Sequence, residues 1–239
     1  MNAFISKIDS MVLLSDETRR VLATLTKHTQ RMGPGERIIE AGDHSSTVNI
    51  VLSGWACRCK ILRNGQRQIT ALLLPGDMCD PHGLLLREVD HTAHTLTTVT
   101  LAKAPGNIVR DLMASDPELA QVLWRQILEE IDIQREWTIN LGQRTAVERI
   151  AHLCCEVSTR LEVVGLRNGH DCDMPITQSE IADITGLSAV HVNRSLQELR
   201  AAGLIELRNK RLTVLDKERL AELAMFDPGY LHRRVVVTR

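Results

Sequence analysis

The sequence predicts an α+β protein made of an N-terminal β-barrel, a long helix and a C-terminal winged helix-turn-helix. Three observations lead to this prediction. Short β-rich runs separated by turn residues lie between Glu36 and Lys103, and a helical period without Gly or Pro follows from 118 to 141. A helix, turn, helix and hairpin pattern then ends the chain. The predicted units are residues 1–115, 116–142 and 143–239.

The composition is that of an ordinary globular protein, with 239 residues of which 44% are hydrophobic and 25% charged. No apolar run is long enough for a membrane span, and the N-terminus lacks the pattern of a signal peptide. We therefore expect a cytoplasmic protein that does not contact membranes. The formal net charge of −1 gives no independent argument for a nucleic-acid partner.

The N-terminal unit is predicted to open with a helix and to continue as strands. Ser15 stands at an N-cap position, with two acidic residues directly after it. Asn64-Gly65 predicts a hairpin turn, and further turn residues occupy 33–35 and 75–77. Many short strands at this spacing predict a small barrel or sandwich.

A long helix is predicted to begin at Asp116-Pro117 and to run for about 30 Å, at 1.5 Å per residue. A small barrel does not need a helix of this length, so we expect its spare apolar face to contact a second copy of the chain. The alternative is a helix that lies only against its own barrel. The residues expected at the dimer interface are Leu123, Ile127, Ile131 and Leu141.

The C-terminal unit is predicted to contain a helix over 178–184, a turn at Gly186 and a second helix over 188–200. A loop over 165–175 precedes them, and a short hairpin with its turn at 208–210 follows. This order of elements is that of a winged helix-turn-helix.

The helix over 188–200 has two different faces. Val192, Leu196 and Leu199 share one side of the helical wheel and are predicted to be buried. The opposite side is small and mostly polar, and its members are Val190, His191, Asn193, Arg194, Gln197 and Glu198. Such a face fits a helix inserted into the major groove of DNA. The alternative is a solvated surface helix with an incidental arginine.

The residue types on this face match the chemistry of base edges. Arg194 can donate two hydrogen bonds to guanine, and Asn193 can read adenine in a similar way. Ser188 and Thr177, at the predicted caps of the two helices, can present hydroxyls and free N–H groups to phosphates. Sequence-specific DNA binding is therefore the function that the residues favour.

The segment ITQSEIADITGLSAVHVNRSLQELRAAGLI resembles the DNA-binding signature of the Crp-Fnr transcription regulators. The order of barrel, long helix and winged domain resembles their architecture over nearly the whole chain. The resemblance implies a homodimer with a cyclic-nucleotide-binding-type double-stranded β-helix, bound to an inverted repeat in double-stranded DNA. RNA polymerase is a further candidate partner.

The resemblance also implies roles for individual residues. The family's recognition arginine falls on Arg194, and its phosphate-contacting region falls on Thr177, Ser188 and His191. Lys210, in the turn of the hairpin, is a further expected contact to the DNA backbone. The expected base-contacting residues are Arg194, Asn193, Val190 and Ala189. Where many members carry an acidic base-reading residue, this chain has Val190, so a different half-site is expected.

The effector positions depart from those of the members that bind cyclic AMP. Their Gly-Glu pair corresponds to Asp80-Pro81 here, and their Arg-Ser pair corresponds to His91-Thr92. The fixed cation for the cyclic phosphate is therefore missing, and cyclic AMP is not expected. The effector pocket is expected to contain Asp80, His82, His91 and Thr92, and the identity of the effector stays open.

An iron-sulfur cluster is not expected either, because the family's cluster uses cysteines near the N-terminus and the first cysteine here is Cys57. A haem, metal or thiol redox sensor remains an alternative, with Cys79, His82 and His91 as candidates. His91 and His94 would point to opposite faces of one strand, which weakens a shared metal site.

The remaining cysteines favour packing over chemistry. Cys57 and Cys59 share a strand face with Trp55, and Arg58 takes the other face. The adjacent pair Cys154-Cys155 is predicted in a helix, where neighbours point about 100° apart. We therefore interpret these thiols as interior side chains.

Two other classes of protein share some of these sequence features. An enzyme of the metal-binding cupin type needs several histidines in the strand region 35–54, which offers only His44, so we do not expect catalysis. A regulatory interaction module without DNA binding would show little salt dependence with nucleic acid, whereas a DNA regulator loses affinity steeply as salt rises.

Overall fold

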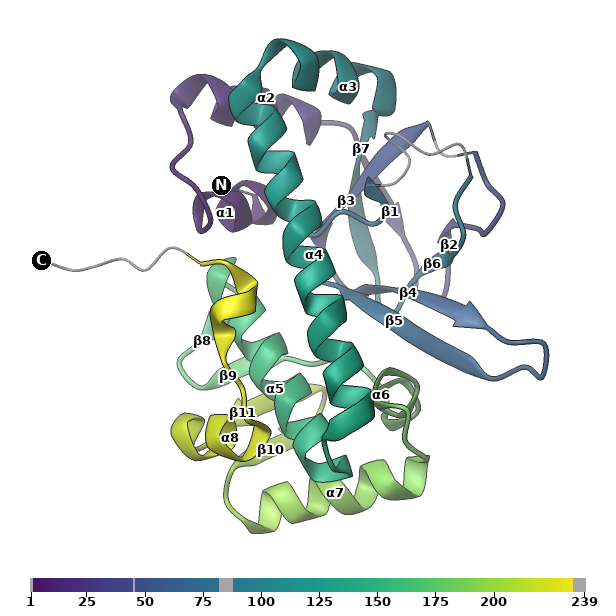
Figure 1. Cartoon of the computed structure of the whole chain (residues 1–239), viewed down its shortest axis with the longest axis vertical. Coiled ribbons are helices and arrows are strands. Elements are labelled where there is room, and N and C mark those ends of the chain that lie inside the picture. The colour runs from purple at the N-terminus through teal and green to yellow at the C-terminus, as the bar shows by residue number, and fades with distance from the viewer. Residues whose placement is uncertain (1, 45, 82–87, 234–239) are drawn as a thin grey trace, which may run out of the picture.

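The computed structural model describes residues 2–44, 46–81 and 88–233, and its central element is the helix α4, Pro117–Gln143. Strands lie on one side of α4, and the C-terminal helices gather around its lower half (Figure 1). The side chain of Asp116 caps the helix by accepting hydrogen bonds from the N–H groups of Glu118 and Leu119. The predicted long helix is confirmed.

Three helices pack on the strands and on the first half of α4. They are α1 (Ala3–Asp9), α2 (Asp16–Leu25) and α3 (Gly106–Ser115). Ser15 is the N-cap of α2, as predicted, and its hydroxyl accepts a hydrogen bond from the N–H of Thr18. The helix α1 was not predicted, although Phe4 and Ile8 on it are fully buried.

The strands form two antiparallel sheets. One sheet has the order β1-β7-β3, from Thr29–Met32, Val99–Pro105 and Thr47–Ser53. The other has the order β2-β6-β4-β5, from Arg37–Ile39, Thr92–Thr95, Ala56–Ile61 and Arg67–Leu73. The predicted barrel is therefore a jelly-roll of two facing sheets in the described part of the chain. A hydrophobic cluster that includes Val51, Leu73 and Leu101 fills the space between them.

The C-terminal unit begins with α5 (Ala146–Val163) and contains α6 (Gln178–Thr185), α7 (Ala189–Ala201) and α8 (Lys217–Ala224). Its sheet has the order β10-β11-β9-β8, from Ile205–Arg208, Arg211–Val214, Asp171–Asp173 and Arg167–Asn168. The helix-turn-helix and its hairpin are confirmed. The segment 165–175, predicted as a loop, contains the short hairpin β8–β9. Its second strand joins the sheet through the pairing of Cys172 with Leu212 of β11, and Cys172 is buried there.

After α8 the chain returns to α4 through a short 3-10 helix, Pro228–Leu231. The hydroxyl of Tyr230 donates to Glu156 of α5 at 2.9 Å. His232 Nε2 lies 2.6 Å from a carboxylate oxygen of Asp132 on α4. The C-terminal unit is thus attached to α4 at its beginning and at its end.

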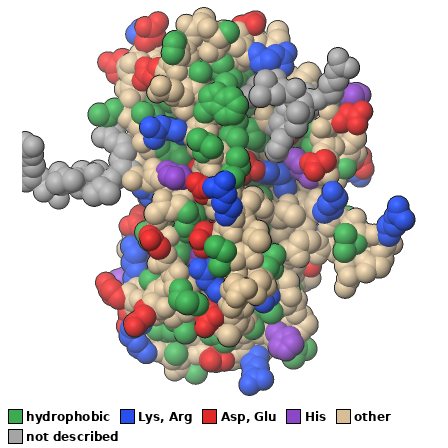
Figure 2. Space-filling view, viewed as in Figure 1, with side chains coloured by type: hydrophobic (Ala, Val, Ile, Leu, Met, Phe, Trp, Pro, Cys, Tyr) green, Lys and Arg blue, Asp and Glu red, His purple; other side chains and the backbone are tan. Residues whose placement is uncertain are grey.

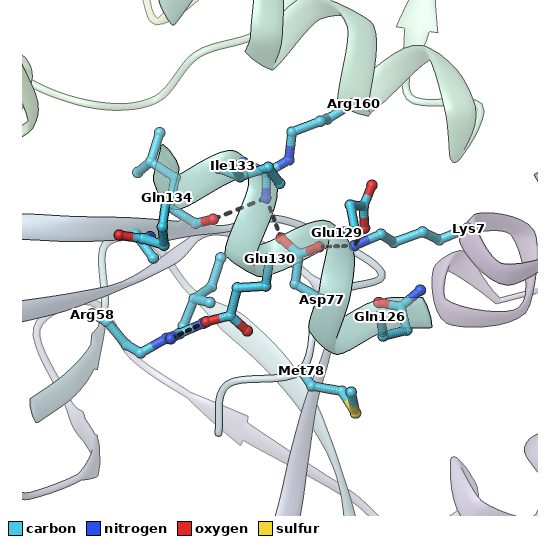
Figure 3. A pocket seen from close by; sticks show the side chains of 13 residues that line it. Lys7, Arg58, Asp77, Met78, Gln126, Glu129, Glu130, Ile133, Gln134 and Arg160 are labelled. Atoms are coloured by element: carbon cyan, nitrogen blue, oxygen red, sulfur yellow. Dashed lines mark hydrogen bonds and ion pairs between the residues drawn. The ribbon is translucent and has the colours of Figure 1, made fainter. Parts of the chain in front are cut away.

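A buried ionic cluster, the inner junction, connects the sheets, α4 and α5. Arg160 of α5 contacts Asp77 at 2.5 Å and Glu156 at 3.0 Å. Lys7 of α1 contacts Asp77 at 2.7 Å and Glu129 of α4 at 2.6 Å. Lys7, Asp77, Glu129 and Arg160 line a small cavity of about 30 Å³, which Figure 3 shows together with the labelled residues around it.

Charge balance explains why this cluster tolerates burial. Burial opposes the charge on Lys7, yet Asp77 and Glu129 hold the pKa of its ammonium above the usual value. Burial also opposes the charge on Asp77, yet Lys7 and Arg160 hold the pKa of that carboxyl below its usual value.

A second contact, the edge contact, joins β5 to α6. The guanidinium of Arg67 lies 2.7 Å from a carboxylate oxygen of Asp183. The amide of Gln68 donates to the backbone carbonyl of Asp183 at 2.6 Å. The helix-turn-helix is therefore held directly against the strand region.

No helix in the described ranges combines the length and the apolar character that a membrane crossing requires.

Candidate DNA-binding interface

Local capping positions the first helix of the helix-turn-helix. The hydroxyl of Thr177 accepts from the N–H of Glu180 at 3.2 Å, and the carboxylate of Glu180 accepts from the N–H of Thr177 at 2.6 Å. The same carboxylate also accepts from the Thr177 hydroxyl at 2.8 Å. Thr177 is exposed as expected, but its hydroxyl proton is already engaged within this capping box.

Gly186 forms the turn between α6 and α7. Its backbone is left-handed, with φ of 64°, a conformation that glycine adopts without strain. A Cβ at this position would meet the side chain of Leu141 at 3.0 Å. The turn therefore sits tightly against the end of α4.

The recognition helix α7 has the two predicted faces. Val192, Leu196 and Leu199 are buried against the C-terminal core. The exposed side chains near its N-terminus are Ala189, Val190, His191, Asn193 and Arg194. In Figure 1, α7 lies at the end of the molecule opposite α3.

The two polar base-reading candidates differ in their present contacts. Arg194 makes no side-chain hydrogen bond or ion pair with any residue in the described ranges, so its guanidinium is available to a ligand. The amide of Asn193 donates to the side-chain oxygen of Gln178 at 3.4 Å. Sequence reasoning missed Gln178, which the turn brings next to the recognition helix.

The expected DNA-backbone contacts fall into two places. Ser188 caps α7, because its hydroxyl accepts from the N–H of His191 at 3.3 Å and lies 3.0 Å from the Nδ1 of the same residue. Lys210 lies in the exposed turn between β10 and β11, where Asn209 and Lys210 have φ of 50° and 61°. The two positive φ values are those of a two-residue hairpin turn. Thr177, the cap of α6, belongs to the helix-turn-helix together with Ser188 and His191.

The expected effector residues are not all brought together. A groove of about 500 Å³ between the strands and α4 is lined by His91, Arg58 and Glu130, among others. His91 pairs with Asp90 at 3.0 Å. Asp80 is fully buried, and Thr92 lies in β6 opposite Cys59. His82 falls outside the described residues.

The groove contains a cation that sequence reasoning assigned only to a strand face. Arg58 is buried and forms an ion pair with Glu130 of α4. Burial opposes its charge, but Glu130 and, more weakly, Asp80 hold the pKa of the guanidinium above its usual value. Glu130 lies 72 positions after Arg58 in the chain, so no local sequence pattern could indicate this ion pair.

Cys57 and Cys59 are interior side chains, as interpreted from the sequence, but they do not face the space between the two sheets. Their sheet face packs against the C-terminal unit, whereas Ala56 and Leu73 face the space between the sheets. His94 joins the pair, with Nε2 at 3.3 Å from the sulfur of Cys57. Both faces of this sheet are covered, so alternation alone did not identify the inner one.

The thiols are poorly suited to redox chemistry in this conformation. Burial raises the pKa of Cys79 to about 12, and burial likewise raises the pKa of Cys57. Within the described residues, no group of three or more His, Cys, Asp and Glu side chains is arranged to hold a metal ion. The candidate Cys79 is fully buried.

The residues expected at a dimer interface differ in their burial. Leu123 is only 2% exposed and packs inside its own chain, so its assignment to a dimer surface is corrected. Ile127 is partly buried in the same cluster. Leu141 lies beside the turn at Gly186 but is still 38% exposed. Ile131 is exposed, as an interface residue must be.

The exposed apolar stripe of α4 includes residues that sequence reasoning missed. Trp124 is 47% exposed and Leu128 is 54% exposed, and with Ile131 they follow the four-then-three spacing of a coiled-coil seam. Hydrophobic side chains gather over the upper half of α4 in Figure 2. The spacing was present in the sequence, but a second apolar face on the same helix masked it.

Comparisons with known proteins agree with this architecture. The profile described as "Crp-like helix-turn-helix domain" matches residues 148–223, and that described as "Cyclic nucleotide-binding domain" matches residues 29–116. The structure of FixK2 from Bradyrhizobium japonicum is similar in fold, with a TM-score of 0.74 at 24% sequence identity, over 82% of this chain and 96% of that one.

Two curated relatives extend the similarity to sequence. The chain is 34% identical to the transcriptional activator protein FnrL of Cereibacter sphaeroides, over 85% of this chain and 84% of that protein. It is 31% identical to a probable transcriptional activator of Rhizobium leguminosarum bv. viciae, over 84% of each. The chain therefore belongs to the Crp-Fnr family of DNA-binding transcription regulators.

Proposed function

We propose that this Crp-Fnr regulator binds an inverted-repeat operator as a homodimer, and that its effector is not cyclic AMP. The observation that carries the proposal is the unpaired, exposed guanidinium of Arg194 near the start of α7. A flexible cation held on a rigid helix is suited to reading a guanine in the major groove.

The exposed stripe of α4 supports the homodimer. Trp124, Leu128 and Ile131 would leave a contiguous apolar strip in water if the chain were alone. A second α4 in parallel register would cover the strip, and its two-fold axis would present two copies of α7 to successive turns of one duplex.

The groove beside α4 argues against cyclic AMP. The buried cation of the groove, Arg58, is already neutralised by Glu130, and Asp80 adds a second carboxylate nearby. The other cations that line the groove, Lys60 and Arg135, are exposed rather than enclosed around a ligand.

The remaining aspects of the proposed role rest on the relatives. Of the two curated relatives named above, FnrL is described as a transcriptional activator and the Rhizobium leguminosarum protein as a probable transcriptional activator. We propose that this chain also activates transcription, in the cytoplasm and in contact with RNA polymerase, without any catalytic activity of its own.

Arg194→Ala tests the DNA-binding assignment. Loss of a bidentate base contact is expected to weaken specific binding by about 1 to 3 kcal/mol and to leave the oligomeric state unchanged. A gel-shift titration at two salt concentrations, on a duplex selected by the wild-type protein, measures the specific affinity. Sedimentation velocity measures the oligomeric state. Equal specific affinity of the variant and the wild type would contradict the role of Arg194.

Ile131→Glu tests the dimer. A charge in the exposed stripe is expected to separate the two copies and to reduce affinity for a two-site operator by about 100-fold, because the linked second site is lost. Sedimentation velocity gives the mass, and the gel shift gives the affinity. Asn168→Glu, which adds the same charge at an exposed position on β8, is the control. A dimeric Ile131→Glu protein would place the interface elsewhere.

A further inference from the structure

Val190 is an apolar side chain in an unusual position. It is 76% exposed, the largest exposed fraction among the large hydrophobic side chains of the described residues. The other large apolar residues of α7, Val192, Leu196 and Leu199, are buried at 4% exposure or less. Within the part of the chain that the structure describes, this isopropyl group on the outward face of a DNA-reading helix is left exposed to water.

Helix geometry links Val190 to Arg194. Residues four apart lie one above the other on the same face, with Cβ atoms about 5 to 6 Å apart. Stacked bases along one strand are about 3.4 Å apart. The group that Val190 reaches is therefore within about two base pairs of the guanine that Arg194 reads.

The surroundings of Val190 favour close approach to a base. Ala189, beside it, is small and exposed, and Ser188 folds its hydroxyl back onto His191 at 3.0 Å. A single exposed valine is far smaller than the apolar patches by which proteins recognise one another. Direct contact with DNA accounts for Val190 better than a protein partner does.

Only one apolar group protrudes into the major groove, the 5-methyl group of thymine. Valine has neither a donor nor an acceptor, so it cannot read the polar edges of adenine, guanine or cytosine. An acidic residue at this position would instead accept a hydrogen bond from the amino group of cytosine.

We propose that Val190 reads the methyl group of a thymine within two base pairs of the guanine contacted by Arg194. The inference rests on the proposed DNA-binding function and specifies part of its half-site: a thymine where an acidic residue would select cytosine.

The first test is a selection from a duplex library with a randomised central segment, carried out with wild-type protein, Arg194→Ala, Val190→Ala and Val190→Glu. The wild type is expected to enrich an inverted repeat that contains the guanine and the nearby thymine. Val190→Ala is expected to lose the preference for thymine at that position alone, and Val190→Glu is expected to shift it toward cytosine. Because Val190 is exposed, neither substitution should disturb the fold.

The second test removes only the methyl group. Uracil replaces the identified thymine in the selected duplex, and a uracil outside the half-sites serves as the control. Loss of one buried methyl contact is expected to weaken wild-type binding about four-fold per half-site. Val190→Ala is expected to bind the two duplexes equally.

The outcomes separate this inference from the function on which it rests. A selected repeat that depends on Arg194 but has no thymine nearby, or equal wild-type affinity for thymine and uracil, would overturn the role of Val190 alone. Failure of the wild-type protein to enrich any duplex would overturn both.

Discussion

The inner junction and the edge contact join the same two units, but they differ in their access to water. Arg160 and Asp77 of the inner junction have side chains 7% and 9% exposed. Arg67 and Asp183 of the edge contact are 30% and 24% exposed. Water can replace a lost partner more readily at the edge than in the interior. The inner junction should therefore contribute more than the edge contact to holding the two units together.

Arg160→Met should produce the largest effect. Removal of the guanidinium leaves Asp77 and Glu156 buried with one fewer cation, and we expect a loss of about 3 to 5 kcal/mol in the free energy of unfolding. Urea denaturation measures it. Arg37→Met, at an exposed ion pair with Glu40, is the matched control and should cost less than about 1 kcal/mol. Similar losses for both variants would remove the distinction between buried and exposed contacts.

The pH dependence of stability sharpens the same comparison. Because Lys7 and Arg160 outweigh burial and hold the pKa of Asp77 below its usual value, the folded state binds this proton less tightly than the unfolded state. The stabilisation is therefore present at neutral pH and is lost as the pH falls below about 4. The difference in unfolding free energy between the wild type and Arg160→Met should shrink from about pH 7 to about pH 3.5. A difference that stays constant over this range would mean that Asp77 is not the titrating partner.

The edge contact should give the smallest effect. A double-mutant cycle with Arg67→Ala and Asp183→Ala is expected to show a coupling of about 0.2 to 1 kcal/mol in urea denaturation, reduced by added salt. The charge-exchanged pair Arg67→Asp with Asp183→Arg should recover part of it. A coupling as large as that of the inner junction would show that this edge is as important to the fold as the buried cluster.

The helix-turn-helix was predictable because its signals are local. Thr177 and Ser188 cap their own helices, and Gly186 occupies a left-handed turn that few other residues adopt. The outward direction of Arg194 follows from the buried stripe of the same helix. Each of these inferences needs only residues within one or two turns.

The junctions were not predictable for the opposite reason. Arg160 and Asp77 are 83 positions apart, and Arg67 and Asp183 are 116 apart. Leu123 was misplaced because α4 has an apolar face on each side, one against its own chain and one exposed. Periodicity identifies apolar faces but does not say what covers each of them.

The return of the chain to α4 has a mechanical consequence. A body fixed at one point can swivel in every direction, whereas a body fixed at two points can turn only about the line between them. α5 follows α4 directly, and His232 lies 2.6 Å from Asp132 farther up the same helix. The inner junction and the edge contact fix the same unit to the strands at two further points. A swing of the recognition helix about an axis near α4 therefore requires these contacts to break as well.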